Sequence, residues 1–510
     1  MTDIAASTPA PDLPKAYATL MDRFARIGRI GDALGILHWD QQTSMPDGAA
    51  DSRAEAIATL EVMSHDALTD PRLSDLLDAA EAAGNDLEVW HAANLVEMRR
   101  AWRRADAVPA ELVEARSRAV SACEMVWRTA RAQSDFAMLL PSLSEVLRLE
   151  REAGAAKAAA SGLSLYDALL DDYEPGGRSA AIDTLFDDLA GFLPDFTARV
   201  LDRQAAAPKP TAPDGPFPVE AQRALAVRLM QAIGFDFTRG RLDISLHPFC
   251  GGATDDVRIT TRYDETDFLK ALMGVLHETG HAMYELGRPA GWKGQPVGES
   301  RGMVLHESQS LLVEMQVCRG PSFLAFAAPI MRDALGGSGS AWGADNLARL
   351  STRVTRSFIR VDADEVTYPA HVILRYRLER AMLAGDLALA DLPGAWADGM
   401  QDLLGVVPPD DRRGCLQDIH WPGGAWGYFP TYTLGAMAAA QLYRAARSQD
   451  EAIEPGIARG DFAPLMAWLR QKVHGLGSSD SSDGVLTRAT GAPLGTAAFK
   501  AHLTDRYLPD

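Results

Sequence analysis

The sequence has few cysteines, a deficit of positive charge and no long hydrophobic run. Its 510 residues include only four cysteines, at positions 123, 250, 318 and 415, and no CxxC pair. Four separated thiols in a chain of this length do not form a disulfide scaffold, so we expect reduced cysteines in a cytosolic protein. No apolar run approaches the roughly 18–20 residues that span a bilayer, which excludes a membrane-spanning helix.

The charge and the N-terminal stretch narrow the protein class further. The net charge is −19, and a generally acidic chain repels phosphate backbones, so nucleic acid is disfavoured as a partner. The stretch "MTDIAASTPAPDLPK" (residues 1–15) has neither a basic region nor an apolar core, and therefore does not resemble a signal peptide. We expect a soluble, cytoplasmic protein with no membrane partner.

Helical patterns dominate the sequence, whose hydrophobic content of 47% and charged content of 23% are typical of globular proteins. Apolar residues recur at helical spacing in segments rich in Ala, Leu, Arg and Glu. These segments are 14–37, 52–62, 86–105, 108–133, 141–160, 180–204, 219–234, 266–287, 344–358, 364–384 and 432–447. The pattern predicts a mainly α fold.

Two features interrupt this pattern. The Pro-rich stretch 205–218 predicts a connector between two possible subdomains, 1–204 and 219–510, of a single domain 1–510. "RLDISLHPF" (241–249) and "DDVRITTRYD" (255–264) alternate apolar and polar residues around a Gly-rich turn, and they predict the one β-hairpin.

The segment "GVLHETGHAMYELG" (274–287) carries the strongest chemical signal. His277 and His281 are four residues apart, so on a helix capped by Asp264 or Thr266 they share one face. That spacing lets two imidazoles bind one zinc ion at ~2.0–2.1 Å. Glu278 projects about 100° around the helix, which suits a base acting on water activated by the metal. Chance is the alternative, since about one chain in a hundred with this histidine content contains HExxH by accident.

A catalytic zinc site needs a third protein ligand. The metzincin extension is excluded because Tyr284 and Gly287 replace its Gly and His. Glu285 lies about 12 Å from His277 along the helix axis, and Glu299 is in a loop, so neither is favoured. Glu307, in the helical stretch "VLHESQSLLVEM" (304–315), is the best candidate.

A further group usually orients a metal-bound histidine. In several glutamate-type zincins, an Asp one turn after the ligand glutamate has this role, but Leu311 occupies that position here. Ser310, Asp362 and Asp364 are the alternatives that the sequence offers.

Six motifs occur in a fixed order along the chain. They are "HPF" (247–249), "DVRIT" (256–260), "HETGH" (277–281), "HESQS" (306–310), "IRVDADEVTY" (359–368) and "GCLQDIHW" (414–421). Together they resemble the M32 family of metallocarboxypeptidases, the thermostable carboxypeptidase Taq type. The chain departs from the family where HESQS commonly continues Arg-Leu-x-Glu-Asn, since it has "LLVEM" here.

The resemblance implies a helical, saddle-like zincin-type metallopeptidase with a deep groove and a small sheet near the active site. It implies one metal ion, Zn²⁺ with Co²⁺ as a possible substitute, and release of single C-terminal residues from peptides with broad specificity. It also implies a homodimer. By the motif match, His277, His281 and Glu307 are metal ligands and Glu278 is the catalytic glutamate.

A carboxypeptidase also has to bind its substrate and stabilise an oxyanion. The hairpin is a candidate for holding an extended peptide, with bracing of the helices as the alternative. Its "HPF" and "DVRIT" resemble family motifs that line the groove, and this resemblance implies His247 and Arg258 as substrate contacts. Arg360 and Arg258 are candidates to bind the terminal carboxylate, although a structural ion pair is the alternative for each.

The oxyanion donor is expected within "DIHWPGGAWGYFPTY" (418–432). His420 with Tyr428 or Tyr432 resembles the His and Tyr of helical zincins of the angiotensin-converting-enzyme type, and a phenol or an imidazolium can donate to the developing charge. A packed aromatic cluster is the alternative. For the whole chain, the alternatives are an oligopeptidase on the same scaffold and a helical binding protein with a vestigial site.

Overall fold

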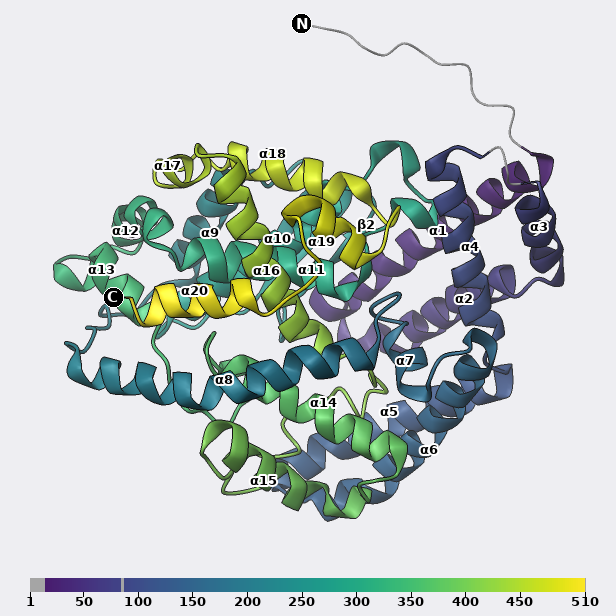
Figure 1. Ribbon diagram of the computed structural model, residues 1–510, viewed down its shortest axis with the longest axis horizontal. Helices are drawn as coiled ribbons and strands as arrows, with labels where there is room; N and C mark the ends of the chain where they lie inside the picture. Colours follow the sequence, from purple (N-terminus) through teal and green to yellow (C-terminus); the bar gives the residue numbers. More distant parts are fainter. Residues whose placement is uncertain (1–13, 84–86, 510) are drawn as a thin grey trace, which may run out of the picture.

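The computed structural model describes residues 14–83 and 87–509, and it is built almost wholly of helices (Figure 1). The helices are α1 Lys15–Thr43, α2 Ala50–Leu68, α3 Pro71–Ala82, α4 Val89–Asp106, α5 Ala110–Gln133, α6 Phe136–Ser161, α7 Leu165–Leu170, α8 Ser179–Ala206, α9 Val219–Ile233, α10 Phe268–Leu286, α11 Gly302–Leu311, α12 Pro321–Ala334, α13 Ala344–Ser351, α14 Tyr368–Ala384, α15 Leu392–Leu404, α16 Pro430–Gln449, α17 Ile453–Ile457, α18 Ala463–Lys472, α19 Ser482–Thr490 and α20 Ala497–Tyr507. The strands are β1 Gly240–Ile244, β2 Cys250–Ala253 and β3 Asp256–Thr261. The predicted mainly α fold is confirmed.

Most predicted helices are present, with different ends. The helix expected over 14–37 continues to Thr43 as α1, whereas the one expected over 344–358 stops at Ser351 as α13. Residues 1–13, on which the expectation about a signal peptide largely rests, lie outside the described residues, as does residue 86 at the start of another predicted helix. In the described part of the chain, no helix combines the length and apolar character needed to cross a bilayer.

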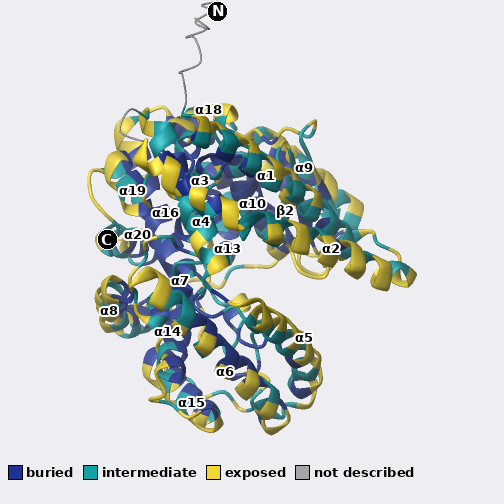
Figure 2. Ribbon diagram, turned by 90° about the vertical axis from the view of Figure 1, so that its right-hand side faces the viewer, coloured by how far each residue is buried: buried dark blue, intermediate teal, exposed yellow. Residues whose placement is uncertain are grey.

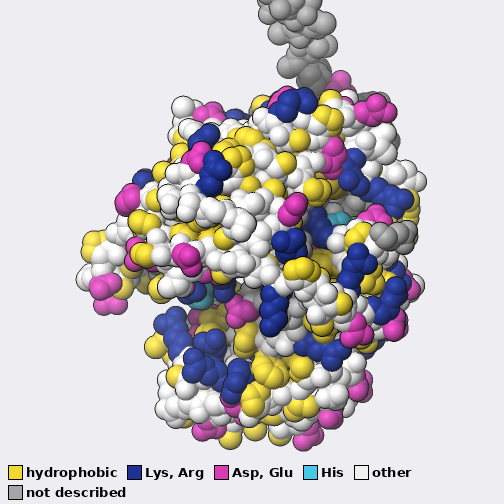
Figure 3. Space-filling model, turned by 90° about the vertical axis from the view of Figure 1, so that its left-hand side faces the viewer, with side chains coloured by type: hydrophobic (Ala, Val, Ile, Leu, Met, Phe, Trp, Pro, Cys, Tyr) yellow, Lys and Arg dark blue, Asp and Glu magenta, His cyan; other side chains and the backbone are white. Residues whose placement is uncertain are grey.

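The helices form two bodies, one above the other (Figure 2). α1, α2, α10, α16 and α18 belong to the upper body, and α5, α6, α14 and α15 to the lower one (Figures 1 and 2). The space-filling view in Figure 3 shows the surface hollowed between the bodies, with Lys and Arg side chains along the lower rim. This is the saddle shape that the family resemblance implied.

Two apolar clusters form the core, and the larger one joins the two bodies. The larger extends from Cys123 to Tyr507 and draws on helices from both sides of the connector after α8. The smaller is formed by α1, α3 and α4 around Tyr17, Leu77 and Met98. The expected reduced state of the thiols agrees with four free cysteines. The division into subdomains stays a prediction.

The small sheet corrects one expectation. The two predicted strands are not hairpin partners, because β1 pairs with β3 in parallel, with Leu242 opposite Ile259. The hairpin is formed instead by β2 and β3, and the sheet order is β1-β3-β2. The Gly-rich "CGGA", expected as a turn, is itself the strand β2.

Close packing explains why β2 is Gly-rich. Gly252 has φ +109°, and a Cβ there would be 3.2 Å from the backbone nitrogen of Arg258 in β3. A Cβ on Gly35 of α1 would be 3.2 Å from the carbonyl carbon of Gly252. α1 therefore covers the β2 edge of the sheet, and Gly-rich sequence marks close approach of two backbones as well as turns.

Candidate metal centre and active site

The HETGH motif lies in the buried helix α10. Most residues of this helix are buried, including the polar Glu278, Thr279 and His281. Its N-cap differs from the prediction: Asp267 accepts from the backbone N–H of Lys270, whereas Asp264 accepts from Thr266 in the preceding turn. A cap only has to lie one residue before the helix, and three neighbouring polar residues left the choice open.

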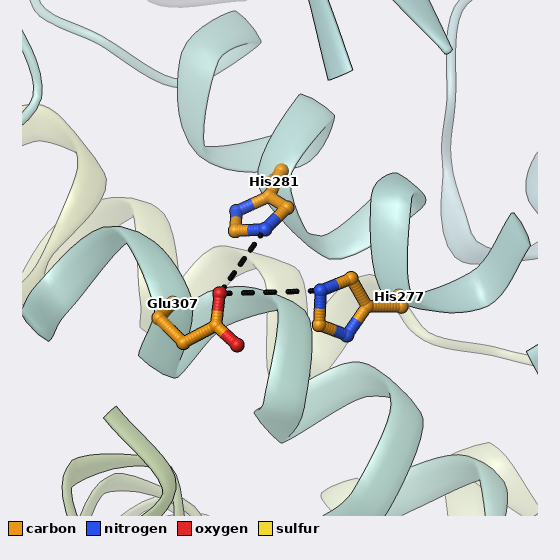
Figure 4. A group of neighbouring side chains, drawn as sticks. All are labelled: His277, His281 and Glu307. Carbon is orange, nitrogen blue, oxygen red and sulfur yellow. Dashed lines mark ion pairs between the residues drawn. The ribbon is translucent and has the colours of Figure 1, made fainter. Parts of the chain in front are cut away.

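Three side chains from α10 and α11 converge on one point (Figure 4). His277, His281 and Glu307 each offer one atom, and these atoms lie within 4.8 Å of one another. Glu307 Oε2 is 3.4 Å from His281 Nε2 and 3.9 Å from His277 Nε2. Two imidazoles and a carboxylate are a donor set that Zn²⁺ accepts, so the residues fit the metal that the sequence predicts.

Two glycines bring the helices close enough for this arrangement. A Cβ on Gly280, between the two histidines, would lie 2.6 Å from Ser310 Cα of α11. A Cβ on Gly435 of α16 would lie 2.7 Å from Glu307 Cβ. α11 is therefore packed between two glycine surfaces, which fix the position of Glu307.

A glutamate that the sequence analysis missed orients one histidine. Glu314 Oε2 accepts a hydrogen bond of 3.0 Å from His277 Nδ1, which leaves Nε2 directed at Glu307. Arg319 donates to the other oxygen of Glu314 at 2.6 Å and to the backbone oxygen of Ser351. Glu314 lies two helical turns after Glu307, in the π-helical segment Leu312–Cys318, and it is the glutamate of the "LLVEM" stretch.

The three orienting groups predicted from the sequence are wrong. The hydroxyl of Ser310 donates to the backbone oxygen of Glu307. Asp362 pairs with Lys270 at the surface. Asp364 accepts backbone N–H groups, including that of Thr367. The orienting carboxylate was expected one helical turn after Glu307, but Glu314 lies two turns after it.

Glu285 and Glu299, which the sequence disfavoured as the third metal ligand, have other partners in the structure. Glu285 accepts from His306 Nε2 at 2.9 Å, and Glu299 pairs with Arg288. The ring of His306 stacks on that of His281, with centroids 4.6 Å apart. Glu285 therefore holds a stacking partner of a candidate ligand and is not part of the donor set.

Burial and close charges perturb the titration of this cluster. Burial lowers the pKa of His277, but Glu307 and Glu314 outweigh it and raise that pKa to about 10. Burial, with His306 nearby, lowers the pKa of His281 to about 4. Burial raises the pKa of the Glu278 carboxyl to about 7, and the residue is only 7% exposed. Strongly perturbed groups gathered at one place are characteristic of functional sites.

The predicted oxyanion donors lie together. His420 Nε2 is 3.1 Å from the Tyr432 hydroxyl, and the rings of Tyr428 and Tyr432 are 5.1 Å apart. Burial raises the pKa of both phenols, and the nearby Glu307 raises it further. Burial lowers the pKa of His420 to about 4, so at neutral pH it is an imidazole and not the imidazolium that the sequence left open.

Arg360 is buried in an ion pair, the alternative considered for it. Its Nε and Nη2 donate to Asp418 Oδ1 at 3.0 and 2.8 Å, and its Nη1 donates to the Tyr368 hydroxyl. Arg375 donates to the other oxygen of Asp418 at 2.6 Å and stacks over Trp396. Arg375 and Asp418 were not predicted, because they are distant in sequence and neither is in a metal-ligand pattern.

The remaining predicted substrate residues lie in or beside the sheet. Arg258 of β3 donates to Asp256 and lies over the ring of Trp39. His247 is in the exposed segment after β1, where its backbone oxygen accepts from Ser245. Within the described residues, neither makes a polar contact with the His277–His281–Glu307 cluster, so their roles stay predictions.

A buried HExxH helix with a glutamate from the next helix is the arrangement of a metallopeptidase. The family model for carboxypeptidase Taq (M32) metallopeptidase matches residues 19–507. The chain belongs to this family, a family of metallocarboxypeptidases.

Relatives agree over nearly the whole chain. Thermostable carboxypeptidase 1 of Thermus thermophilus is 37% identical over 502 residues, which cover 96% of this chain and 98% of that protein. Carboxypeptidase 1 of Bacillus subtilis is 33% identical over 489 residues, covering 95% and 97%. The solved structure of Trypanosoma cruzi metallocarboxypeptidase 1 superposes with a TM-score of 0.95 at 41% identity, covering 97% of this chain and 99% of that one.

Proposed function

We propose that the chain is a zinc-dependent carboxypeptidase that releases single residues from the C-terminus of peptides with broad specificity. The observation that carries this proposal is the convergence of His277, His281 and Glu307 on one point. Glu278 is buried on α10, the helix that also carries both histidines. Zn²⁺ suits two imidazoles and a carboxylate, and Co²⁺ is the expected substitute.

Each residue has a definite task in the proposed reaction. A divalent ion held by His277, His281 and Glu307 supplies Lewis-acid activation of water and of the scissile carbonyl. Glu278 takes a proton from the attacking water on its carboxylate and passes it to the leaving amine. Burial of this carboxylate raises its pKa to about 7, which favours both steps.

The oxyanion is stabilised from α16 and the loop before it. The phenols of Tyr428 and Tyr432 are protonated at neutral pH, because burial and the nearby Glu307 raise their pKa, so both can donate a hydrogen bond to the oxyanion. His420, neutral and bonded to Tyr432, orients that hydroxyl. All three remain assigned to catalysis in this proposal.

An arginine binds the terminal carboxylate of the substrate. Arg360 uses Nε and both terminal nitrogens on Asp418 and Tyr368, and its side chain is 6% exposed. Arg258 uses Nε and one terminal nitrogen on Asp256, and its side chain is 17% exposed. These contacts favour Arg258 as the carboxylate-binding residue, with His247 of the segment between β1 and β2 as a further substrate contact, and they leave Arg360 a structural role.

Product analysis of one unstructured peptide tests the reaction. Zinc-loaded wild-type protein should remove single C-terminal residues in succession, as seen by mass spectrometry. Glu278→Gln should bind zinc and lose about 10²–10⁴-fold in rate. Glu299→Gln, which alters an outlying carboxylate paired with Arg288, is the matched control and should retain activity.

Other products would change the assignment in defined ways. Internal or dipeptide cuts would retain the metal site and replace the exopeptidase by an oligopeptidase. Absence of both zinc and cleavage would support the vestigial binding protein. We also propose that the protein is cytoplasmic and that it forms a homodimer. Light scattering on the zinc-loaded protein tests the homodimer.

A further inference from the structure

The loop between Asp418 and Phe429, called the donor loop, carries the proposed oxyanion donor Tyr428 and His420, which orients the hydroxyl of Tyr432. His420 lies near its start and Tyr428 near its end, and Trp421 and Gly427 are their direct neighbours. The loop closes on itself through a 2.8 Å hydrogen bond from the Ala425 N–H to the backbone oxygen of His420. Its position relative to the metal helices therefore depends on what holds Trp421 and Gly427.

One buried carboxylate holds both. Glu379 of α14 accepts from the Trp421 indole N–H at 2.7 Å on one oxygen and from the Gly427 backbone N–H at 2.8 Å on the other. The Tyr166 hydroxyl of α7 donates to that second oxygen at 3.0 Å. Glu379 thus joins the lower body to both ends of the donor loop.

The contacts around Glu379 leave the loop little freedom. Gly427 has φ +90°, and a Cβ there would lie 2.8 Å from the Leu170 backbone nitrogen, so the loop backbone packs directly on α7. Trp421 stacks on Trp426 at 5.7 Å and meets Trp396 edge-on at 6.1 Å. Small displacements of catalytic donors are costly, since about 1 Å can reduce a rate 10²-fold.

Stability alone does not account for this residue. Glu379 is completely buried and receives three hydrogen bonds, yet none of the described residues forms an ion pair with it. Burial raises its pKa to about 7, which means that the folded protein bears a cost to ionise it. A buried carboxylate without a countercharge is retained where its geometry is needed.

We propose that Glu379 is a positioning residue: its carboxylate fixes Trp421 and Gly427, and through them the orientation of His420 and Tyr428 toward the metal centre. The inference rests on the proposed function, because the loop matters only if its side chains act on a substrate. Glu379 itself touches none of the proposed metal ligands among the described residues.

Glu379→Gln tests the proposal with little change in shape. The amide has one accepting oxygen and an NH₂ group, so it cannot accept from both Trp421 and Gly427, and one loop end loses its partner. With zinc-loaded protein at pH 8, we expect kcat to fall about 10–100-fold while KM stays within about threefold. Zinc content per chain, measured by mass spectrometry, should be unchanged.

A second variant breaks the same bond from its other side. Trp421→Phe deletes the indole N–H and keeps an aromatic ring, and it should lower kcat about 3–10-fold. Because both changes remove one interaction, the double variant should be no slower than Glu379→Gln alone. Trp421→Phe also keeps the test valid if Glu379→Gln does not fold.

Glu454→Gln is the matched control. Glu454 also accepts three hydrogen bonds, from Ser322, Tyr443 and Arg447, but it does not contact the donor loop. The Glu454→Gln variant should have a lower melting temperature than wild type and a kcat within about twofold of the wild-type value. A purely structural Glu379 would behave in the same way.

The outcomes separate the two proposals. If wild-type protein cleaves peptides and Glu379→Gln keeps its kcat, or if the effects of Glu379→Gln and Trp421→Phe multiply, the positioning role is overturned and the proposed function stands. If Glu379→Gln loses zinc along with activity, the positioning role is also overturned. Wild-type protein that cleaves no peptide overturns both.

Discussion

Two buried charged clusters, one around His277 and His281 and the other around Asp418, have opposite net charge. Around His277 and His281, the carboxylates of Glu278, Glu307 and Glu314 outnumber the single guanidinium of Arg319. Around Asp418, two guanidiniums share one carboxylate. The first cluster is complementary to a cation, and the second retains an excess of positive charge.

The difference in charge suits the two clusters to different roles in the proposed reaction. The excess of carboxylates attracts the metal ion that the family requires, and the ion would neutralise it. The positive excess is spread over aromatic faces, with Arg375 over Trp396 and Arg360 over Tyr432, both by cation–π contact. Tyr432 is also a proposed oxyanion donor, so in the proposed reaction this charge favours the negative charge that develops there.

Two buried carboxyl groups, Asp418 in the positive cluster and Glu174 outside both clusters, have pKa values shifted in opposite directions. Although Asp418 is buried, its two arginines hold its pKa far below the ordinary range. The burial of Glu174, whose side chain bonds Ser482 and the Val304 N–H at the start of α11, raises its pKa to about 7. Nearby cations therefore decide whether burial of a carboxyl group is offset.

The largest expected effect comes from removing the countercharge of the positive cluster. Asp418→Asn leaves Arg360 and Arg375 buried without a carboxylate, and it should destabilise the protein by about 3–5 kcal/mol. Urea denaturation at pH 8 measures this. Arg375→Met, which removes the excess charge instead, should cost less. Asp187→Asn, at an exposed pair with Arg377, is the control and should cost at most about 1 kcal/mol.

The second-largest expected effect tests the raised pKa of Glu174. Because the pKa of Glu174 is raised from 4.5 to about 7 on folding, the folded state binds the proton more tightly. Stability from this group is present below its unfolded pKa and is lost as pH rises through about 7. The unfolding free energy of wild type minus that of Glu174→Gln should fall by up to about 3 kcal/mol between pH 5 and pH 8. A pH-independent difference would show that Glu174 ionises normally.

The third effect concerns the negative cluster. Glu314→Gln removes the charge that orients His277 and should weaken zinc binding about 10–100-fold, measured by competition with a chelator. Ser310→Ala, which deletes a hydroxyl bonded only to the backbone of Glu307 within the described residues, is the control and should bind zinc as wild type does. Equal weakening in both variants would mean that packing of α11, and not the Glu314 carboxylate, sets the affinity.

The two clusters also show what the sequence could and could not predict. His277 and His281 are on one helix, so their spacing fixes their relation, and Glu307 follows in a helix whose pattern is visible. Asp418 and Arg375 are 43 residues apart and meet only through tertiary packing, which no local pattern records. Glu314 was within reach of sequence analysis, since it is two turns after Glu307, but a rule taken from other zincins directed the search to the first turn.

The smallest expected effect is that of changing Asp362. Asp362, predicted to orient a histidine, forms a 2.6 Å pair with Lys270 in which both side chains are about half exposed, at 48% and 62%. Solvent screens such pairs, so Asp362→Asn should change the unfolding free energy by less than about 1 kcal/mol. Zinc affinity should stay as in wild type, in contrast to Glu314→Gln. A loss of affinity in Asp362→Asn comparable to that in Glu314→Gln would mean that the negative cluster extends to the surface.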